Sequence, residues 1–455
     1  MAPTILRVLQ APGIQRIFLH DYVGIDVPTL RSLEGGGMNC YAERALVMAQ
    51  RGDIVAVLDP VDPNYLHYLG DLGVGPGTDG VVALNASAEL LNTSPLSLLA
   101  RLAVDGDAIS RVAERIDRTR EAKLNPYFAS PVVAAVRSRL ENCAGREVIV
   151  EAGSVGATDL ANRKDRVREA AQVLGVPTPD GEVCGWSSPD VGCVESAHAL
   201  VEAITRHIAG TGSVMIRGAW SMHGVDNLTI ANGDLDVDGV RQWLAQRRHL
   251  CTYLVETRVP LVASPNLQLW ISDDGRSVVH LATTNQRLDA RSAYRGSEFP
   301  HRTELDGDLI TSALTLGRWL SSMGYRGPLG IDFIETVDRD SGKRIHLLAE
   351  INGRINGATY ALALGERLNQ VRAATNRSPI SAWVTNTALE VRARSFSELY
   401  DLLGELAYTH ALPCGVVPYN TGLLPRGQVH LAILAATVED AKALERELIA
   451  RVGTI

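Results

Sequence analysis

The chain has 455 residues, 46% of them hydrophobic and 21% charged, which is the composition of an ordinary α/β protein of about three domains. The 52 acidic residues outnumber the 44 basic ones and no Lys/Arg-rich run occurs, which argues against a nucleic-acid partner. No apolar stretch is long enough to span a bilayer and residues 1–10 are too weakly apolar for a signal peptide, so we expect a cytoplasmic protein without membrane contacts.

The first part of the chain, residues 1–150, alternates short apolar runs with helical patterns, which predicts a doubly wound parallel sheet. Buried strands are expected at residues 54–59 and 81–84, and a helix at residues 40–50. Residues 75–80 match the GxGxxG dinucleotide fingerprint as text. They precede a strand instead of following one, so we interpret them as a turn and disfavour a Rossmann-type NAD enzyme.

The middle of the chain begins with a run of Gly, Ser and other small residues at 151–162, which is typical of a linker. Apolar spacing after it predicts helices at residues 165–174, 196–208 and 240–249, with a strand at residues 212–217.

The end of the chain is strand-rich up to about residue 365, and helical patterns follow. Helices are predicted at residues 395–406 and 438–451, separated by a Pro/Gly-rich loop at residues 413–427. The sequence alone assigns no chemistry to this C-terminal extension.

A β-hairpin is predicted around residue 341, because apolar runs at residues 329–334 and 345–351 flank a polar segment that contains Gly342. The mean of 332 and 350 is 341, so Asp332 and Glu350 should lie opposite each other on the paired strands.

The period of two along a strand adds two further side chains to this face. Asn352 should point to the same face of the sheet as Glu350, and Arg354 should point there too if the strand continues. Two carboxylates and an amide oxygen suit Mg²⁺, and a neighbouring arginine suits phosphate or carboxylate oxygens. The competing interpretation is a solvated hairpin whose charges face water.

The pattern D…ExNxR after Gly-Pro-Leu-Gly-Ile-Asp resembles the nucleotide end of an ATP-grasp ligase. More narrowly, the chain resembles the peptide ligases of bacterial natural-product pathways that carry a pre-ATP-grasp domain, over about residues 35–431. The matching segments are Gly35-Gly36-Gly37-Met38-Asn39-Cys40-Tyr41, Arg51-Gly52-Asp53-Ile54-Val55, Ala263-Ser264-Pro265-Asn266-Leu267-Gln268, Thr284-Asn285-Gln286 and Glu298-Phe299-Pro300.

The resemblance implies an α/β protein that is divided into four consecutive segments. A doubly wound, Rossmann-like pre-ATP-grasp domain would occupy residues 1–150, and the first half of an α+β ATP-grasp domain, with a mobile lid, residues 160–250. The second half, with the metal and phosphate hairpin, would occupy residues 251–370. A small C-terminal α+β extension would complete the chain at residues 371–455.

The resemblance also implies site residues. Asp332, Glu350 and Asn352 would hold the metal, and Arg354 would be the catalytic residue that neutralises charge on the acyl phosphate. Lys164, eleven residues before Gly-Val-Pro, would take the place of the first phosphate-binding lysine; the alternative is a surface lysine. The further nucleotide contacts implied are Arg217, Ser221, His223, Gly224 and Glu256.

One of these positions departs from the family pattern, because Arg217 stands where a second lysine is usual. Arginine keeps the charge but not the compact ammonium, so a structural ion-pair role is the alternative. Arg291, Tyr294 and Arg295 lie in a segment that resembles the loop beside the acyl site, and they would bind substrate. Exposure to solvent is the alternative for each of them.

The activity implied is ATP-dependent joining of an amino-acid carboxylate to an amine through an acyl phosphate, with ATP and Mg²⁺, or alternatively Mn²⁺. Glutamate is the suggested donor, and a small or non-proteinogenic amino acid or peptide the acceptor. Such enzymes are commonly homodimers. Two alternatives stay open: a nucleotide-binding module without turnover, and another ATP-grasp reaction that forms an acyl phosphate.

Overall fold

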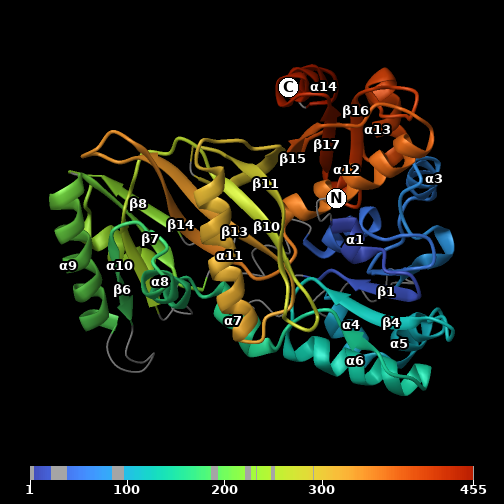
Figure 1. The fold of residues 1–455 in the computed structure, drawn as a ribbon, viewed down its shortest axis with the longest axis horizontal. Helices are drawn as coiled ribbons and strands as arrows, with labels where there is room; N and C mark the ends of the chain where they lie inside the picture. The colour runs from blue at the N-terminus through green and yellow to red at the C-terminus, as the bar shows by residue number, and fades with distance from the viewer. Residues whose placement is uncertain are drawn as a thin grey trace.

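The computed structural model describes residues 5–21, 38–84, 97–185, 193–220, 227–231, 233–246, 252–290 and 292–453. These residues form three sheets with helices packed on them (Figure 1). None of the helices within the described ranges is long and apolar enough to cross a membrane.

The N-terminal region is a parallel sheet in the order β3-β2-β1-β4-β5, which confirms the predicted doubly wound class. Its strands are β1 (Ile14–Leu19), β2 (Ile54–Val57), β3 (Val81–Ala83), β4 (Glu121–Pro126) and β5 (Ile149–Val150). The helices around it are α1 (Ile5–Leu9), the 3₁₀-helix η1 (Met38–Val47), α3 (Pro63–Asp71), η2 (Thr78–Gly80), α4 (Leu98–Val104), α5 (Gly106–Ala113) and α6 (Pro131–Ala144). The segment that matches GxGxxG ends in η2 and leads into β3, as the turn interpretation expected.

The predicted linker at residues 151–162 contains a helix, α7 (Val155–Asn162), and this part of the prediction was wrong. Ser154 starts the helix, because its hydroxyl accepts a hydrogen bond from the backbone N–H of Ala157 at 3.1 Å. Small residues that indicated a linker instead let α7 pack closely, with Ala157 and Ala161 both buried.

A smaller antiparallel sheet follows, in the order β6-β9-β7-β8. Its strands are β6 (Gly181–Gly185), β7 (Ser213–Gly218), β8 (Asn227–Ala231) and β9 (Thr252–Thr257), and the helices of this region are α8 (Lys164–Val173), α9 (Cys193–Thr211) and α10 (Val237–Ala245). It has a hydrophobic core of its own and forms one end of the molecule (Figure 1).

The largest sheet has eight strands in the order β14-β13-β10-β11-β12-β15-β17-β16. The strands are β10 (Pro265–Ile271), β11 (Val278–Leu288), β12 (Tyr294–Phe299), β13 (Gly327–Val337), β14 (Arg344–Asn352), β15 (Ala382–Glu390), β16 (Gly415–Asn420) and β17 (Gln428–Ala435). Its helices are α11 (Asp306–Ser322), α12 (Gly357–Ala374), α13 (Phe396–Leu403) and α14 (Val438–Val452), with the 3₁₀-helices η4 (Gly404–Leu406) and η5 (Leu424–Arg426).

The predicted loop at residues 413–427 contains β16, which is a second correction. Pro418 lacks a backbone N–H, and the order of the strands places β16 at the edge of the sheet, where a proline is tolerated. Every residue of β16 is buried, because the strand packs between β17 and the N-terminal region.

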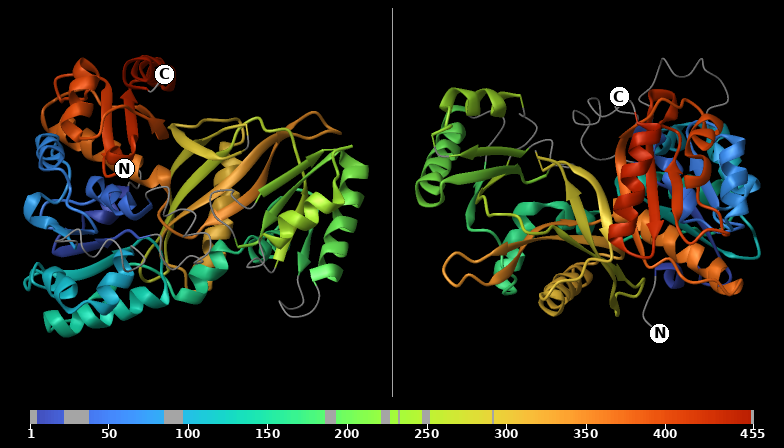
Figure 2. Two further views of the ribbon diagram at one scale, coloured as in Figure 1. Left: turned by 180° about the vertical axis from the view of Figure 1, so that it is seen from behind. Right: turned by 90° about the horizontal axis from the view of Figure 1, so that it is seen from above.

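The C-terminal extension therefore continues the large sheet and shares a hydrophobic core with the N-terminal region (Figure 2). Two tyrosine hydroxyls of α3 cross this boundary: Tyr65 donates to the carbonyl of Pro418 at 3.1 Å and Tyr68 to that of Tyr408 at 3.0 Å.

A buried histidine, His20 at the end of β1, ties this core to α12. Its Nε2 donates to Oδ1 of Asn125, and its Nδ1 accepts from the hydroxyl of Tyr360, both at 3.0 Å. Burial, with the nearby charge of Arg44, lowers the pKa of His20 to about 3, despite the opposing hydrogen bond to Asn125.

We expect acid to destabilise the protein through His20. The unfolded state binds a proton below pH about 6.5 and the folded state only near pH 3, so between these values the free energy of unfolding falls by up to about 1.4 kcal/mol per pH unit. Urea unfolding from pH 7 to pH 4 measures this slope. The variant His20→Gln should show a shallower slope, and an identical slope in both proteins would contradict the assignment.

Candidate active site

The hairpin of β13 and β14 pairs Asp332 directly with Glu350, which confirms the predicted register. A bulge between Asp332 and Phe333 shifts the register by one residue beyond this pair. The turn closes through the backbone N–H of Asp338, which donates to the carbonyl of Lys343 at 2.8 Å, and Gly342 adopts the positive φ of 68° that the turn needs.

Asp332 is buried and its carboxylate is held by amides. Asn352 donates to Oδ2 of Asp332 at 2.8 Å, and Asn266 of β10 donates to Oδ1. Gln268, two residues along β10, donates to Asn266 and at 3.0 Å to Oδ1 of Asn356, the N-cap of α12. This polar row links the hairpin to the start of α12.

Glu350 faces Lys164, the first residue of α8, with 3.1 Å between Oε2 and Nζ. Burial opposes ionisation of Glu350, but the charges of Lys164, Arg217 and Arg354 outweigh it and lower the pKa of Glu350 to about 2. Burial and the charge of Glu350 have the opposite effect on Asp332 and raise its pKa to about 7.

Arg354 lies just beyond β14, and its guanidinium donates to Oδ1 of Asn162 on α7 at 2.6 Å. The same amide oxygen accepts from the backbone N–H of Gly353 at 3.2 Å, so α7 positions the end of the hairpin. An added Cβ at Gly353 would lie 2.6 Å from the Cβ of Ala161, and this close approach requires glycine.

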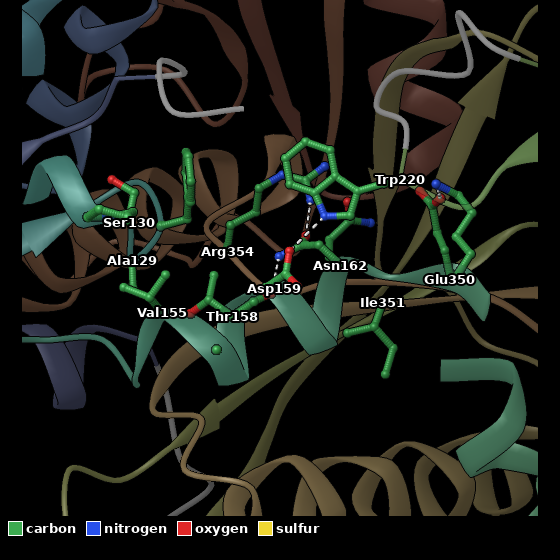
Figure 3. A pocket seen from close by; sticks show the side chains of 15 residues that line it. Ala129, Ser130, Val155, Thr158, Asp159, Asn162, Trp220, Glu350, Ile351 and Arg354 are labelled. Carbon is green, nitrogen blue, oxygen red and sulfur yellow. Dashed lines mark hydrogen bonds and ion pairs between the residues drawn. The ribbon is translucent and has the colours of Figure 1, made fainter. Parts of the chain in front are cut away.

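A cavity of about 360 Å³ opens beside these residues (Figure 3). Glu350 and Arg354 contribute charge, α7 forms one wall, and Trp220 donates to Oδ1 of Asp159 at 3.0 Å across it. The full lining is Phe128, Ala129, Ser130, Pro131, Val155, Gly156, Thr158, Asp159, Asn162, Lys164, Trp220, Glu350, Ile351, Asn352 and Arg354. The N-terminal region, the small sheet and the hairpin thus all contribute to this cavity.

Arg217 is engaged in a buried ion pair. Its Nε and Nη2 donate to Oε2 of Glu256 at 2.8 and 2.6 Å, and its Nη1 donates to the carbonyl of Ala349 at 2.9 Å. Arg168 of α8 donates to the other oxygen of Glu256 at 2.9 Å. Glu256 therefore lies between two arginines, and the contact of either Glu256 or Arg217 with nucleotide stays a prediction.

Two of the predicted substrate residues, Tyr294 and Arg295, are neighbours in β12, and neither is among the residues that line the cavity. Tyr294 is half-buried, with its hydroxyl 2.9 Å from Oγ of Ser297, whereas Arg295 is half exposed and donates to Oδ2 of Asp289 at 2.7 Å. The predicted residues Ser221, His223, Gly224 and Arg291 lie outside the described residues.

Sequence reasoning assigned no role to Asn162, Arg168, Asn266 and Gln268. Asn266 and Gln268 did carry a signal, because polar residues two apart in an apolar strand point to one face. Asn162 and Arg168 carried no signal in the sequence, because their partners Arg354 and Glu256 are distant in the chain and meet them only in the folded protein.

The donor set fits a hard divalent cation. Two carboxylates and an amide are the oxygen ligands such ions prefer, and the raised pKa of Asp332 shows a carboxylate that an added positive charge would stabilise. Lys164 already forms an ion pair with Glu350. Within the described ranges no three His, Cys, Asp or Glu side chains are grouped as metal ligands, so Asn352 would have to complete the set.

Comparison with known proteins bears on the fold. The family model of the pre-ATP-grasp domain matches residues 42–141. The curated protein sequences that were compared with this chain include no match.

Solved structures match over nearly the whole chain. N5-carboxyaminoimidazole ribonucleotide synthetase in complex with ADP is 15% identical, with a TM-score of 0.55 over 96% of each chain. The same enzyme from Thermus thermophilus is 16% identical, with a TM-score of 0.51 over 97% of this chain and 99% of that one. Biotin carboxylase from Campylobacter jejuni in its β,γ-ATP complex is 13% identical, with a TM-score of 0.56 over 96% and 91%. These similarities confirm the expected fold.

We expect Arg217→Lys to destabilise the protein by about 2 kcal/mol, because lysine cannot reproduce the paired hydrogen bonds to Glu256 and the bond to Ala349. Urea unfolding measures the change. Arg206→Lys is the control: Arg206 also makes two hydrogen bonds to a glutamate, from Nη2 to both oxygens of Glu182, but it is exposed, so its effect should be within about 0.5 kcal/mol. Unchanged stability of Arg217→Lys would contradict a structural role for Arg217.

Proposed function

We propose that this chain, which has the fold of the ATP-grasp ligases with an N-terminal pre-ATP-grasp domain, is an ATP-dependent ligase. It would join the carboxylate of an amino acid to the amine of another amino acid or peptide and release ADP and phosphate. The observation that carries the proposal is that Glu350 and Asn352 line one cavity together with two cations, Lys164 and Arg354, while Asp332 lies directly behind them, paired with Glu350 and bonded to Asn352.

The proposed reaction has two steps. A carboxylate oxygen of the donor attacks the γ-phosphorus of ATP, the bond to the β,γ-bridging oxygen breaks, and ADP leaves. The amine nitrogen then attacks the acyl carbon and loses a proton. The bond between the acyl carbon and the phosphate oxygen breaks, and phosphate leaves. Neither step needs a side-chain nucleophile, so the task of the protein is positioning and neutralisation of charge.

The cavity residues suit these tasks. Lys164 would meet the phosphates, because its ammonium already faces the acid that borders the cavity. Arg354, which Asn162 orients, would neutralise the acyl phosphate. Phe128 and Trp220 make much of the rest of the wall apolar, which favours the exclusion of water from an acyl phosphate.

Asp332, Glu350 and Asn352 would hold Mg²⁺, or alternatively Mn²⁺, which supplies charge neutralisation for the ATP phosphates when bound. Before the metal binds, Lys164 balances Glu350. The amides of Asn266 and Asn352 keep the Asp332 carboxylate in place.

The donor is proposed to be an acidic amino acid such as glutamate, and the acceptor a small or non-proteinogenic amino acid or peptide. One observation favours a nucleotide-binding module without turnover: Arg217, at the place of a usual phosphate-binding lysine, is paired with Glu256. The two candidates differ in whether ATP is consumed.

The test is ADP release from Mg-ATP in the presence of pooled amino acids, with mass spectrometry of each active pool. A ligase yields amino-acid-dependent ADP and a product whose mass is the sum of two substrates minus water. Glu350→Gln should lower ADP release at least a hundredfold, because the charge beside the phosphates is lost.

The matched control is Glu169→Gln on the exposed face of α8, which should keep full activity. Both variants should retain the wild-type melting temperature within a few degrees. Unchanged ADP release by Glu350→Gln would overturn the proposed site. Binding of ATP by the wild type without ADP from any pool would favour the module.

A further inference from the structure

Three buried side chains of the C-terminal extension lack hydrogen-bond partners. Tyr419 and Asn420 of β16 and His430 of β17 are 1%, 0% and 2% exposed. Five of their polar atoms have no partner: the hydroxyl of Tyr419, both amide atoms of Asn420 and both ring nitrogens of His430. Buried polar groups in folded proteins are nearly always paired, so this concentration makes the three residues a candidate site for a polar ligand.

The backbone gathers these groups. Asn420 is the direct cross-strand partner of His430, and a bulge between Pro418 and Asn420 leaves Tyr419 without a partner in the ladder. A bulge re-aims side chains and is frequent beside functional sites. The three residues therefore form one local group, which we call the β16–β17 polar cluster.

The surroundings of the cluster favour an anionic group on the occupant. The ring of Tyr41 lies 5.0 Å from that of His430, and the guanidinium of Arg44 lies 4.5 Å above the rings of both Tyr41 and Tyr360. Burial and the charge of Arg44 lower the pKa of His430 well below its ordinary value, so His430 is neutral and offers one donor and one acceptor. The occupant thus meets a cation beside neutral polar groups.

The cluster lies next to the candidate active site. The guanidinium of Arg44 is 5.9 Å from the ring of Tyr127, and Tyr127 contacts Phe128, which lines the cavity. A substrate held beside Arg44 would therefore be connected to the cavity through Tyr127 and Phe128.

We propose that the β16–β17 polar cluster is the subsite for the amine-bearing substrate, an amino acid or short peptide. Its carboxylate lies toward Arg44, and its polar side group bonds to Asn420, His430 and Tyr419. The assignment rests on the proposed function, and it makes the C-terminal extension a determinant of acceptor choice.

The test measures binding separately from turnover. The wild type and the variants Asn420→Leu and His430→Phe are loaded with Mg²⁺ and a non-hydrolysable ATP analogue, and pools of L-amino acids and dipeptides are added. We expect at least one pool to raise the melting temperature of the wild type. Calorimetry with the active compound should show at least tenfold weaker binding to both variants and unchanged affinity for the analogue.

Two further variants guard against a general loss of structure. Tyr419→Phe removes one hydroxyl only and should weaken binding severalfold. Thr336→Val removes another buried hydroxyl without a partner, on β13, and should leave binding unchanged. Without ligand, Asn420→Leu and His430→Phe should melt at the wild-type temperature or above it, because unpaired polar groups are removed.

The outcomes separate the two proposals. Unchanged affinity in Asn420→Leu and His430→Phe, or no stabilisation of the wild type by any pool, overturns the subsite. Stabilisation that both variants lose, without ADP release from ATP, supports the subsite and overturns the ligase activity instead.

Discussion

Repulsion between two neighbouring carboxylates is the constraint around which the site is built. The pairing of β13 with β14 places Asp332 and Glu350 side by side in a mostly buried setting, where the charges would be costly without compensation. The protein compensates the two acids differently: amides from neighbouring strands hold Asp332, whereas cations surround Glu350. The difference between their pKa values, about 7 and about 2, expresses this division.

The need to compensate both acids explains why so many elements contribute side chains around Asp332 and Glu350. Lys164 comes from α8, Arg217 from the small sheet, and Arg354 from the end of the hairpin, where α7 orients it. Each cation lowers the cost of the acids, and a divalent metal ion would lower it in the same way if one bound here. Glu256 of the small sheet also bonds to both Arg168 of α8 and Arg217 of β7. These buried ion pairs fix the position of the small sheet relative to α8.

The C-terminal extension takes part in the same architecture. Its strands continue the large sheet through the pairing of β12 with β15, and its core merges with that of the N-terminal region. Because the extension packs against the N-terminal region as well as continuing the large sheet, side chains of β16 and β17 are buried in the core that the two regions share. This packing also gives a physical reason for the burial of every residue in an edge strand such as β16, which would otherwise be open to pairing.

Local patterns in the sequence determined the hairpin, the parallel class of the N-terminal sheet, and the helices at residues 165–174 and 438–451, because periodicity and turn chemistry act between near neighbours. The same patterns misread α7 as a linker and β16 as a loop, because packing against distant segments overrode their Gly, Ser and Pro content. Only the tertiary structure decided that Glu256 pairs with two arginines, that Asn162 holds Arg354, and that Asn420 and His430 lie buried without partners. These contacts join residues from 10 to 192 positions apart, and no local spacing encodes which of them meet.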